Sequence, residues 1–523
     1  RTLQSSNTGS AVIGSFIVER FILEYVLNFN KSARRHHLQA AAGVSFQEDK
    51  IDWTYVNVVD FPADGFTGLS SGATPVLTQG GFTGDNLRSF FGNVNYNFDS
   101  RYYLAATFRA DGSSRFIRDK WGYFPGISAG WNISGEPFLA GGFFDLLKLR
   151  LGWGQTGNNV FGNFLARQLY AGGKNYLGVP GTAPTQIGNA NLRWETTTQT
   201  NIGLDFGFFR NRIAGSLDVY LKSTKDLLLD RPIPTTSGFT SVVQNVGDVE
   251  NKGIDLTLNT LNVQRGTFSW ASTFTLGYVK NTVKKLVNGV PIDAGWDNRI
   301  AEGQPLGSFL GYLTDDLRFK DISGGVGEDG ILGTADDLPP DGKINDADRT
   351  FIGKAIPDFT GGVRYTIRFI GFDLNIFFLF ATGFQIDNVN RVFAEGMNSV
   401  FSPTRNAWEN RWKQEGDQTD VPRLVLDDPN NNRRASNRFI EDGDYLRLKT
   451  VSLGYSLPIG WIRKIGFGNI RIYASGYNLW TLTNYSWYDP EVNLFDGSNT
   501  GLGTDFLTFP QPRSVVFGIN MGF

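Results

Sequence analysis

The feature that most constrains this chain is a strict alternation of apolar residues with polar or small ones, over spans of about ten residues. Segment 201–208 shows it clearly. The apolar set is Ile202, Leu204, Phe206 and Phe208, and the opposing set is Asn201, Gly203, Asp205 and Gly207. Because successive side chains of a β-strand point to opposite faces, the pattern predicts strands with one apolar and one polar face. Segment 213–222 repeats it after the tight turn Arg210-Asn211.

Alternating spans of this kind recur along the whole sequence. The nearest candidate for a membrane helix, Gly371 to Gly383, is shorter than the roughly 18 residues required and contains Asp373. About fifteen alternating spans have the length of a tilted membrane strand, so the sequence predicts an all-β fold, a transmembrane antiparallel β-barrel. The spans are 16–30, 37–47, 86–98, 102–110, 121–132, 146–156, the hairpin 196–224, 251–261, 267–280, 358–369, 372–382, 445–456, 469–481 and 511–523.

The connections between these spans alternate in length, as they do in outer-membrane barrels with short periplasmic turns and long outer loops. The same rule assigns Ser308 to Leu313 to an outer loop, although the segment has a strand-like pattern. A soluble β-sandwich or β-propeller is the alternative, but it would require uniformly short loops or a repeat of about 40–50 residues. Short turns fall at 99–101, 210–211, 264–266 and 370–371, and long connections at 48–85, 157–195, 225–250, 282–357, 383–444 and 482–510.

Composition excludes several classes of function. The chain has no Cys, so it has no disulfide, thiol nucleophile or thiolate metal site. With Lys+Arg 49 against Asp+Glu 51, it has no basic field for nucleic acid. His36 and His37 are neighbours that point opposite ways on a strand or turn, so they cannot readily bind one metal ion together. We therefore expect no enzyme activity and no cofactor. The pattern Gly152-x-Gly154-x-x-Gly157 matches a dinucleotide fingerprint but opens no helix, so it indicates a strand end.

An ordered set of motifs spans nearly all 523 residues. Together they resemble the SusC-like (RagA-like) branch of the TonB-dependent outer-membrane transporters of Bacteroidetes. The motifs are Tyr25 to Lys31, Phe108 to Phe116, Trp121 to Pro125, Leu149 to Asn158, Trp194 to Gln199, Asn245 to Gly253, Asp348 to Gly353, Pro357 to Gly362, Tyr445 to Lys449, Gly476 to Trp480 and Pro510 to Arg513.

The resemblance implies a barrel of about 22 strands, filled by a plug and energised by TonB, that imports oligosaccharides or peptides. It also implies a SusD-like surface lipoprotein, TonB-ExbB-ExbD, outer-membrane lipid and the barrel-assembly machinery as partners, and no nucleic acid. On this interpretation residues 1–523 are the C-terminal part of one barrel domain, and the plug, TonB box and signal peptide lie outside the chain. A passive porin, or a surface assembly or adhesion scaffold that uses a similar barrel, remains as an alternative.

Three groups of residues are candidates for functional sites. Segment 336–348 is rich in Asp and resembles a calcium loop, although Leu338, Pro339 and Pro340 interrupt the ligand spacing. A solvated loop is the other interpretation. The final strand carries an apolar row that ends on an aromatic residue, which predicts a barrel-assembly signal at Phe517, Ile519, Met521 and Phe523. Candidates for ligand or partner contacts in the outer loops are Trp296, Arg405, Trp408, Arg411, Trp412, Trp487 and Tyr488. For the aromatic residues among them, an aromatic girdle at the membrane interface is the other interpretation.

Overall fold

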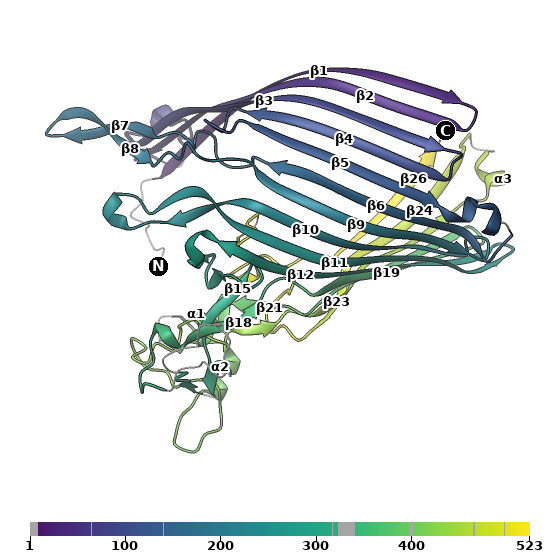
Figure 1. The fold of residues 1–523 in the computed structure, drawn as a ribbon. Coiled ribbons are helices and arrows are strands. Elements are labelled where there is room, and N and C mark those ends of the chain that lie inside the picture. The colour runs from purple at the N-terminus through teal and green to yellow at the C-terminus, as the bar shows by residue number, and fades with distance from the viewer. Residues whose placement is uncertain are drawn as a thin grey trace. The chain divides into compact units, whose positions relative to one another are not determined.

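A computed structural model describes residues 9–63, 65–139, 141–315, 317–322, 340–397, 401–463, 466–495 and 497–522 (Figure 1). One antiparallel sheet of fifteen strands dominates it, in the order β1-β2-β3-β4-β5-β6-β9-β10-β11-β12-β19-β20-β23-β24-β26. Helices are short: α1 (Val389–Glu395), α2 (Arg405–Asn410) and α3 (Ile459–Ile462). Within the described part of the chain, no helix is long and apolar enough to cross a membrane.

All fifteen predicted spans are strands of the large sheet, so the predicted fold class is confirmed. The strands are β1 (Ser10–Ala33), β2 (His36–Val59), β3 (Thr74–Phe98), β4 (Tyr102–Ser113), β5 (Trp121–Asn132), β6 (Phe144–Asn158), β9 (Glu195–Phe208), β10 (Ile213–Pro232), β11 (Ser241–Arg265), β12 (Phe268–Leu286), β19 (Phe359–Phe369), β20 (Phe372–Thr382), β23 (Tyr445–Ser456), β24 (Asn469–Thr483) and β26 (Ser514–Gly522).

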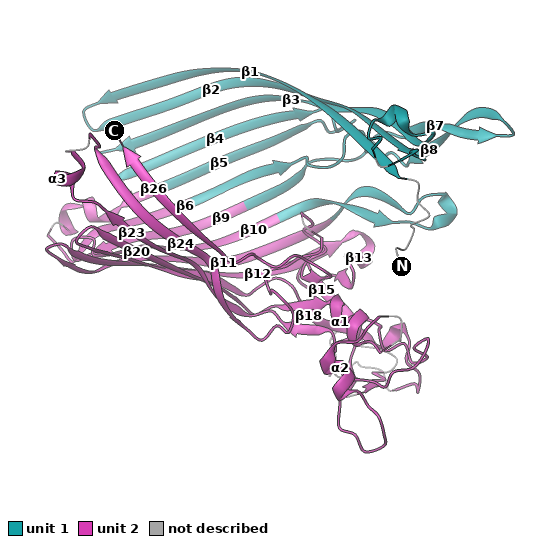
Figure 2. Cartoon of the chain, turned by 180° about the vertical axis from the view of Figure 1, so that it is seen from behind, with its two compact units in different colours: residues 1–129, 152–198, 224–246 teal, residues 130–151, 199–223, 247–523 magenta. Residues whose placement is uncertain are grey.

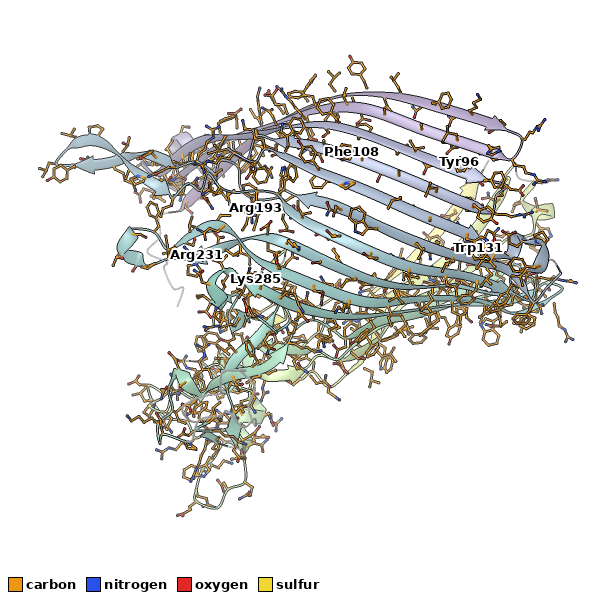
Figure 3. The ribbon with its side chains drawn as sticks, in the orientation of Figure 1. Tyr96, Phe108, Trp131, Arg193, Arg231 and Lys285 are labelled. Carbon is orange, nitrogen blue, oxygen red and sulfur yellow. The ribbon has the colours of Figure 1, made fainter. Side chains whose placement is uncertain are left out.

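The chain divides into two compact units (Figure 2). Unit 1 comprises residues 1–129, 152–198 and 224–246, and unit 2 comprises residues 130–151, 199–223 and 247–523. In unit 1, β1 pairs with β2 over 24 residues without a bulge, and β2 pairs with β3 over nearly its full length. Phe108 of β4, labelled in Figure 3, belongs to the exposed apolar face of this unit.

The prediction that residues 48–85 form a long connection is wrong, because most of this segment belongs to strands β2 and β3. β2 continues to Val59 and β3 begins at Thr74. The ring of Trp53 crosses to β3 over Gly81, where a Cβ would lie only 2.8 Å from the indole. Ladder hydrogen bonds and such cross-strand contacts extend the hairpin beyond the spans that alternation predicts. The connection 225–250 is wrong for the same reason, since β10 continues to Pro232 and β11 begins at Ser241.

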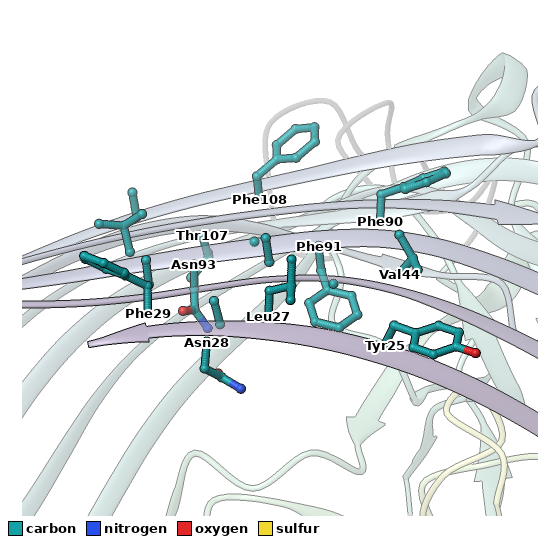
Figure 4. Close-up of a pocket in the computed structure, with 17 residues that line it drawn as sticks. Tyr25, Leu27, Asn28, Phe29, Val44, Phe90, Phe91, Asn93, Thr107 and Phe108 are labelled. Carbon is teal, nitrogen blue, oxygen red and sulfur yellow. The ribbon is translucent and has the colours of Figure 1, made fainter. Parts of the chain in front are cut away.

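An apolar hollow of about 920 Å³ lies along β1 to β4 of unit 1. Figure 4 shows Phe90 and Phe108 on one side of the sheet and Asn28 and Asn93 on the other, as strand alternation requires. The apolar side agrees with the predicted lipid-facing surface. A second apolar cluster closes the loops of this unit, with Phe116, Phe124, Ala166, Leu192 and Trp194 buried together.

Tight turns join the strands of unit 2 at one end of the large sheet. Ile370 and Gly371 both have positive φ, 44° and 83°, between β19 and β20. Two positive φ values in a two-residue hairpin give the backbone the same twist as the flanking strands. At the other end, longer connections carry small sheets and two of the helices. We call residues 287–357, 383–444 and 484–513 of unit 2 the loop module.

The loop module contains several short strands of its own. β13 (Ile292–Ala294), β14 (Asn298–Ile300), β15 (Ser308–Tyr312) and β18 (Arg349–Lys354) form a four-stranded sheet. β21 (Gln385–Asn388), β22 (Ile440–Asp442) and β25 (Thr504–Asp505) form a three-stranded one, and β16 (Thr314–Asp315) pairs with β17 (Arg318–Phe319). The assignment of Ser308 to Leu313 to a loop rather than to a barrel span is confirmed. In unit 1, β7 (Leu169–Tyr176) and β8 (Val179–Gln186) form a separate hairpin.

Candidate ligand and partner surface

The polar face of the large sheet is organised by cross-strand ion pairs. Arg150 of β6 contacts Asp205 of β9 at 2.8 Å and Asp218 of β10 at 2.9 Å. Gly203 leaves the space for this triad, because a Cβ there would lie 2.4 Å from Asp218 Oδ1. Arg471 and Asp373 form a similar pair between β24 and β20, at 2.6 Å. On the opposite face, Ile202 and other large apolar side chains are exposed, as lipid contact requires.

Two of the predicted loop residues, Trp408 and Arg411, form a pair at the C-terminal end of helix α2. The side-chain oxygen of Thr404 accepts a hydrogen bond from Ala407 N at 3.1 Å and so caps the helix. The guanidinium of Arg411 lies 3.7 Å from the ring centroid of Trp408 and donates to the Trp408 carbonyl. Trp408 remains 48% exposed, and the side chain of Arg405 is 90% exposed. An exposed aromatic and arginine pair of this kind suits contact with another protein.

Trp412 lies in a cleft of about 500 Å³ in the loop module. The cleft walls carry charges of both signs beside two aromatic rings, so the cleft suits a small polar ligand with an apolar part. The carboxylate of Asp417 accepts from the backbone N–H groups of Lys413 and Gln414, and these bonds lower the pKa of Asp417. The lining residues are Asp315, Leu317, Arg318, Phe319, Lys320, Trp412, Asp417, Gln418 and Thr419.

Sequence reasoning missed Phe319 and its arginine neighbours. The Arg434 guanidinium lies 4.7 Å from the ring centroid of Phe319 and 4.9 Å from that of Tyr312. Arg438 lies 6.0 Å from the same Phe319 ring. The segment 317–320 alternates apolar and basic residues, which is the one local signal that could have pointed to it.

The other predicted loop aromatics lie elsewhere. Trp296 packs against Phe393 and Phe506, with ring centroids 6.2 and 6.0 Å apart. Trp487 packs against the buried cluster around Phe384 and meets Tyr488 edge-on at 5.6 Å. Tyr488 is 78% exposed. The seven predicted residues thus fall into three groups: one in segment 405–412, one at Trp487 and Tyr488, and Trp296 by itself. Their functional role remains a prediction.

The Tyr445-to-Lys449 motif contributes to a buried ion-pair network. Arg447, 1% exposed, contacts Asp489 and, at 3.1 Å, Glu491. Lys449 contacts Glu491 at 3.1 Å as well. The network fastens the segment after β24 to strand β23, so this motif has a structural use.

The histidines and the acidic segment make hydrogen bonds typical of structural residues. His36 Nδ1 lies 2.7 Å from the Tyr96 hydroxyl and His37 Nδ1 lies 3.0 Å from Ser32 Oγ. In the segment 336–348, residues 336–339 lie outside the described residues. The Asp348 carboxylate accepts from the backbone of Ile322 and Asn345. Among the residues that the structure describes, no three His, Asp or Glu are grouped to hold a metal ion.

The final strand exposes its predicted apolar row. Phe517, Ile519 and Met521 are 80%, 56% and 52% exposed, and β26 pairs with β24. Phe523 lies outside the described residues. Its role in assembly therefore stays a prediction.

These features agree with comparisons to known proteins. The family model described as "TonB dependent receptor-like, beta-barrel" matches residues 3–479. The chain belongs to this family. It is 33% identical to TonB-dependent receptor P3 of Formosa agariphila, over 96% of this chain and 52% of that protein. It is 30% identical to the TonB-dependent receptor SusC of Bacteroides thetaiotaomicron, over 84% of this chain and 44% of that protein.

The structural comparison agrees with the sequence comparison. A structure of the RagAB peptide transporter matches 98% of this chain and 56% of its own, with a TM-score of 0.84 and 25% identity. The resemblance to SusC-like transporters is confirmed, and so are the β-barrel fold and the outer-membrane location. The chain spans about half the length of the curated relatives it matches.

Proposed function

We propose that this chain forms barrel wall and outer loops of an active importer of oligosaccharides or peptides, energised by TonB and working with a SusD-like lipoprotein. The similarity to RagAB over 98% of the chain carries the proposal. The polar strand face, fixed by the Arg150 triad, would line the transport path. The exposed surface of α2 would contact the lipoprotein.

Of the two substrate classes, the cleft at Trp412 favours a short peptide. Arg318 and Lys320 line it together with Asp315, so both termini of a peptide would find an opposite charge. The rings of Trp412 and Phe319 would cover an apolar side chain. A neutral oligosaccharide would also stack on the rings and hydrogen-bond to these side chains, but it carries no charges of its own to pair with both signs.

The test is uptake of fluorescent peptides and oligosaccharides by cells that express the full-length transporter from its native locus. We expect peptide uptake that requires TonB and falls at least about fivefold in the double variant Arg318→Ala/Lys320→Ala. Uptake that persists without TonB would contradict active import and favour a passive porin. TonB-dependent uptake of oligosaccharide alone would keep import and reject the peptide assignment.

A further inference from the structure

Two carboxyl groups are held close together inside the loop module. Asp387, on β21, is fully buried, and neither of its carboxylate oxygens has a hydrogen-bond partner among the described residues. Asp297 immediately precedes β14. Burial, and then the negative charge of Asp297, raise the pKa of Asp387 well above its ordinary value. A buried carboxylate with no partner is strongly unfavourable, so the site requires either a proton or a cation.

Strand alternation determines where Asp387 points. Gln385 and Asp387 are two residues apart on β21, so their side chains lie on the same face. The Gln385 Oε1 accepts a hydrogen bond from the backbone of Lys354 on β18, at 3.0 Å. Asp387 therefore faces the four-stranded sheet formed by β13, β14, β15 and β18.

Hydrogen bonds to the segment around Gly503 bring Asn298 near Asp387. Asp387 N donates to the Gly503 carbonyl at 2.8 Å, and Asn298 Nδ2 donates to the Leu502 carbonyl at 3.0 Å. The backbone of Asp387 and the side chain of Asn298 thus bond to consecutive residues of one segment. Asp297 precedes Asn298, and its negative charge acts on Asp387, so residues with oxygen-bearing side chains come together between the two small sheets.

The buried atoms without partners here are oxygens. Besides the two of Asp387, they include Asn298 Oδ1 and Thr504 Oγ1. Thr504 pairs with Asp387 in the parallel β21–β25 ladder, which puts both side chains on one face. Protonation of Asp387 would supply one donor. A cation about 2.4 Å from each oxygen would satisfy several oxygens that do not hydrogen-bond to one another.

The surrounding charges leave the site negative. Arg349 is the positive group that acts on Asp297, where it opposes the effect of burial on the pKa. When both carboxyl groups are ionised, this one guanidinium balances only one of the two negative charges. Carboxylate, amide and hydroxyl oxygens are ligands that hard cations such as calcium prefer.

We propose that Asp297, Asn298, Asp387 and Thr504 form a binding site for a hard cation, with calcium as its first occupant. The site is distinct from the acidic segment 336–348. It would order the loop module whatever the transporter carries, so it does not rest on the proposed function. With two carboxylates it would bind calcium in the range of about 0.1–1 mM that is typical of extracellular modules.

The test is hydrogen exchange, measured by mass spectrometry on the full-length transporter in detergent. Exchange rates in calcium chloride and in sodium chloride are each compared with the rates in choline chloride at the same ionic strength. The peptides of interest cover residues 297–312 and 385–388. At ten times the dissociation constant, calcium should slow their exchange by about tenfold, because it binds only the folded module. The variants are Asp387→Asn, Thr504→Val and, as a matched control, Asp293→Asn.

Asp293 is on β13 of the same sheet, and its side chain is 75% exposed, so its variant should respond to calcium as the unmodified protein does. Asp387→Asn should abolish the response while the module stays folded, and Thr504→Val should shift the titration midpoint several-fold upward. Sodium protection that Asp387→Asn abolishes would support the site with sodium as its occupant. Exchange unaffected by either ion, or equal protection in Asp387→Asn, would overturn the proposal.

Discussion

Arg150 of β6 and Asp205 of β9 form a two-pronged ion pair, in which Nε and Nη2 of the guanidinium donate to the two carboxylate oxygens at 2.9 and 2.8 Å. Its other donors reach Asp218 of β10, both at 2.9 Å. One arginine therefore joins three strands on the polar face of the sheet. Bidentate geometry makes such a pair stronger and more directional than a single contact.

Replacement of Arg150 by Met should destabilise the barrel by about 1–2 kcal/mol, because two carboxylates would then face each other without a cation. The measurement is the temperature at which the folded band is lost on a heat-modifiability gel. The triple variant Arg150→Met/Asp205→Asn/Asp218→Asn removes the repulsion and should recover part of the loss. A triple variant less stable than Arg150→Met would show that repulsion is not the cause.

The turn between β19 and β20 offers a change in the stabilising direction. Ile370 has φ +44°, which is unfavourable for a β-branched residue. Ile370→Asn should raise stability by about 0.5–1 kcal/mol, whereas Gly371→Ala, at φ +83°, should lower it by about 1 kcal/mol or more. Heat-modifiability gels compare the two variants. Equal effects would contradict the predicted role of the left-handed backbone.

The α2 surface should contact the SusD-like partner. We expect Trp408→Ala/Arg411→Ala to reduce recovery of the neighbouring lipoprotein at least about tenfold when the full-length transporter is pulled down, because aromatic and arginine side chains contribute most at interfaces. Trp461→Ala is the matched control. Trp461 is 71% exposed on α3, which lies in the connection between β23 and β24 at the other end of those strands. Undiminished recovery would remove α2 from the interface.

The buried carboxyl pair should make stability depend on pH when calcium is absent. Burial raises the pKa of Asp297 to about 6, although Arg349 opposes it, and Asp387 shifts in the same direction. The folded state then holds more protons than the unfolded state between pH of about 4 and 6, so stability falls as pH rises through 6. Thermal unfolding in choline chloride should show a loss on the order of 1–2 kcal/mol between pH 5 and 7.5. Asp297→Asn should reduce the loss of stability between these two pH values. An unchanged loss would show that other groups cause the pH dependence.

The predicted apolar row Phe517, Ile519, Met521 and Phe523 of the last strand should promote insertion of the barrel into the outer membrane. Phe517 is 80% exposed on β26, so Phe517→Ser should lower the inserted fraction, as should deletion of Phe523. The inserted fraction is read from outer-membrane preparations on the same gels. Asn520→Ser, on the other face of β26, is the control. If both test variants insert as well as the unmodified protein, the apolar row has no role in assembly and serves only as lipid-facing surface.

The sequence alone determined the strands, because the alternation of faces depends only on neighbouring residues and not on distant contacts. Residues 201–208 could be assigned to two faces from their order, and the exposed Ile202 beside the paired Asp205 agrees with that assignment. Strand ends were harder to predict. The segment 48–85 mixes polar and apolar residues without a long regular alternation, and its pairing in the β2–β3 ladder, with Trp53 over Gly81, is what the sequence did not reveal.

Only the tertiary structure decided which side chains meet. Asp387 and Thr504 are paired in a parallel ladder that no local pattern predicts, and the charge of Asp297, from a third segment, acts on Asp387. The tryptophans show the same limit, since Trp408 pairs with its neighbour Arg411 within one turn whereas Trp296 packs against the distant Phe506. Local spacing fixes which face a residue takes, but contacts between loops depend on register and on the closure of long connections. Those contacts are set by the whole fold.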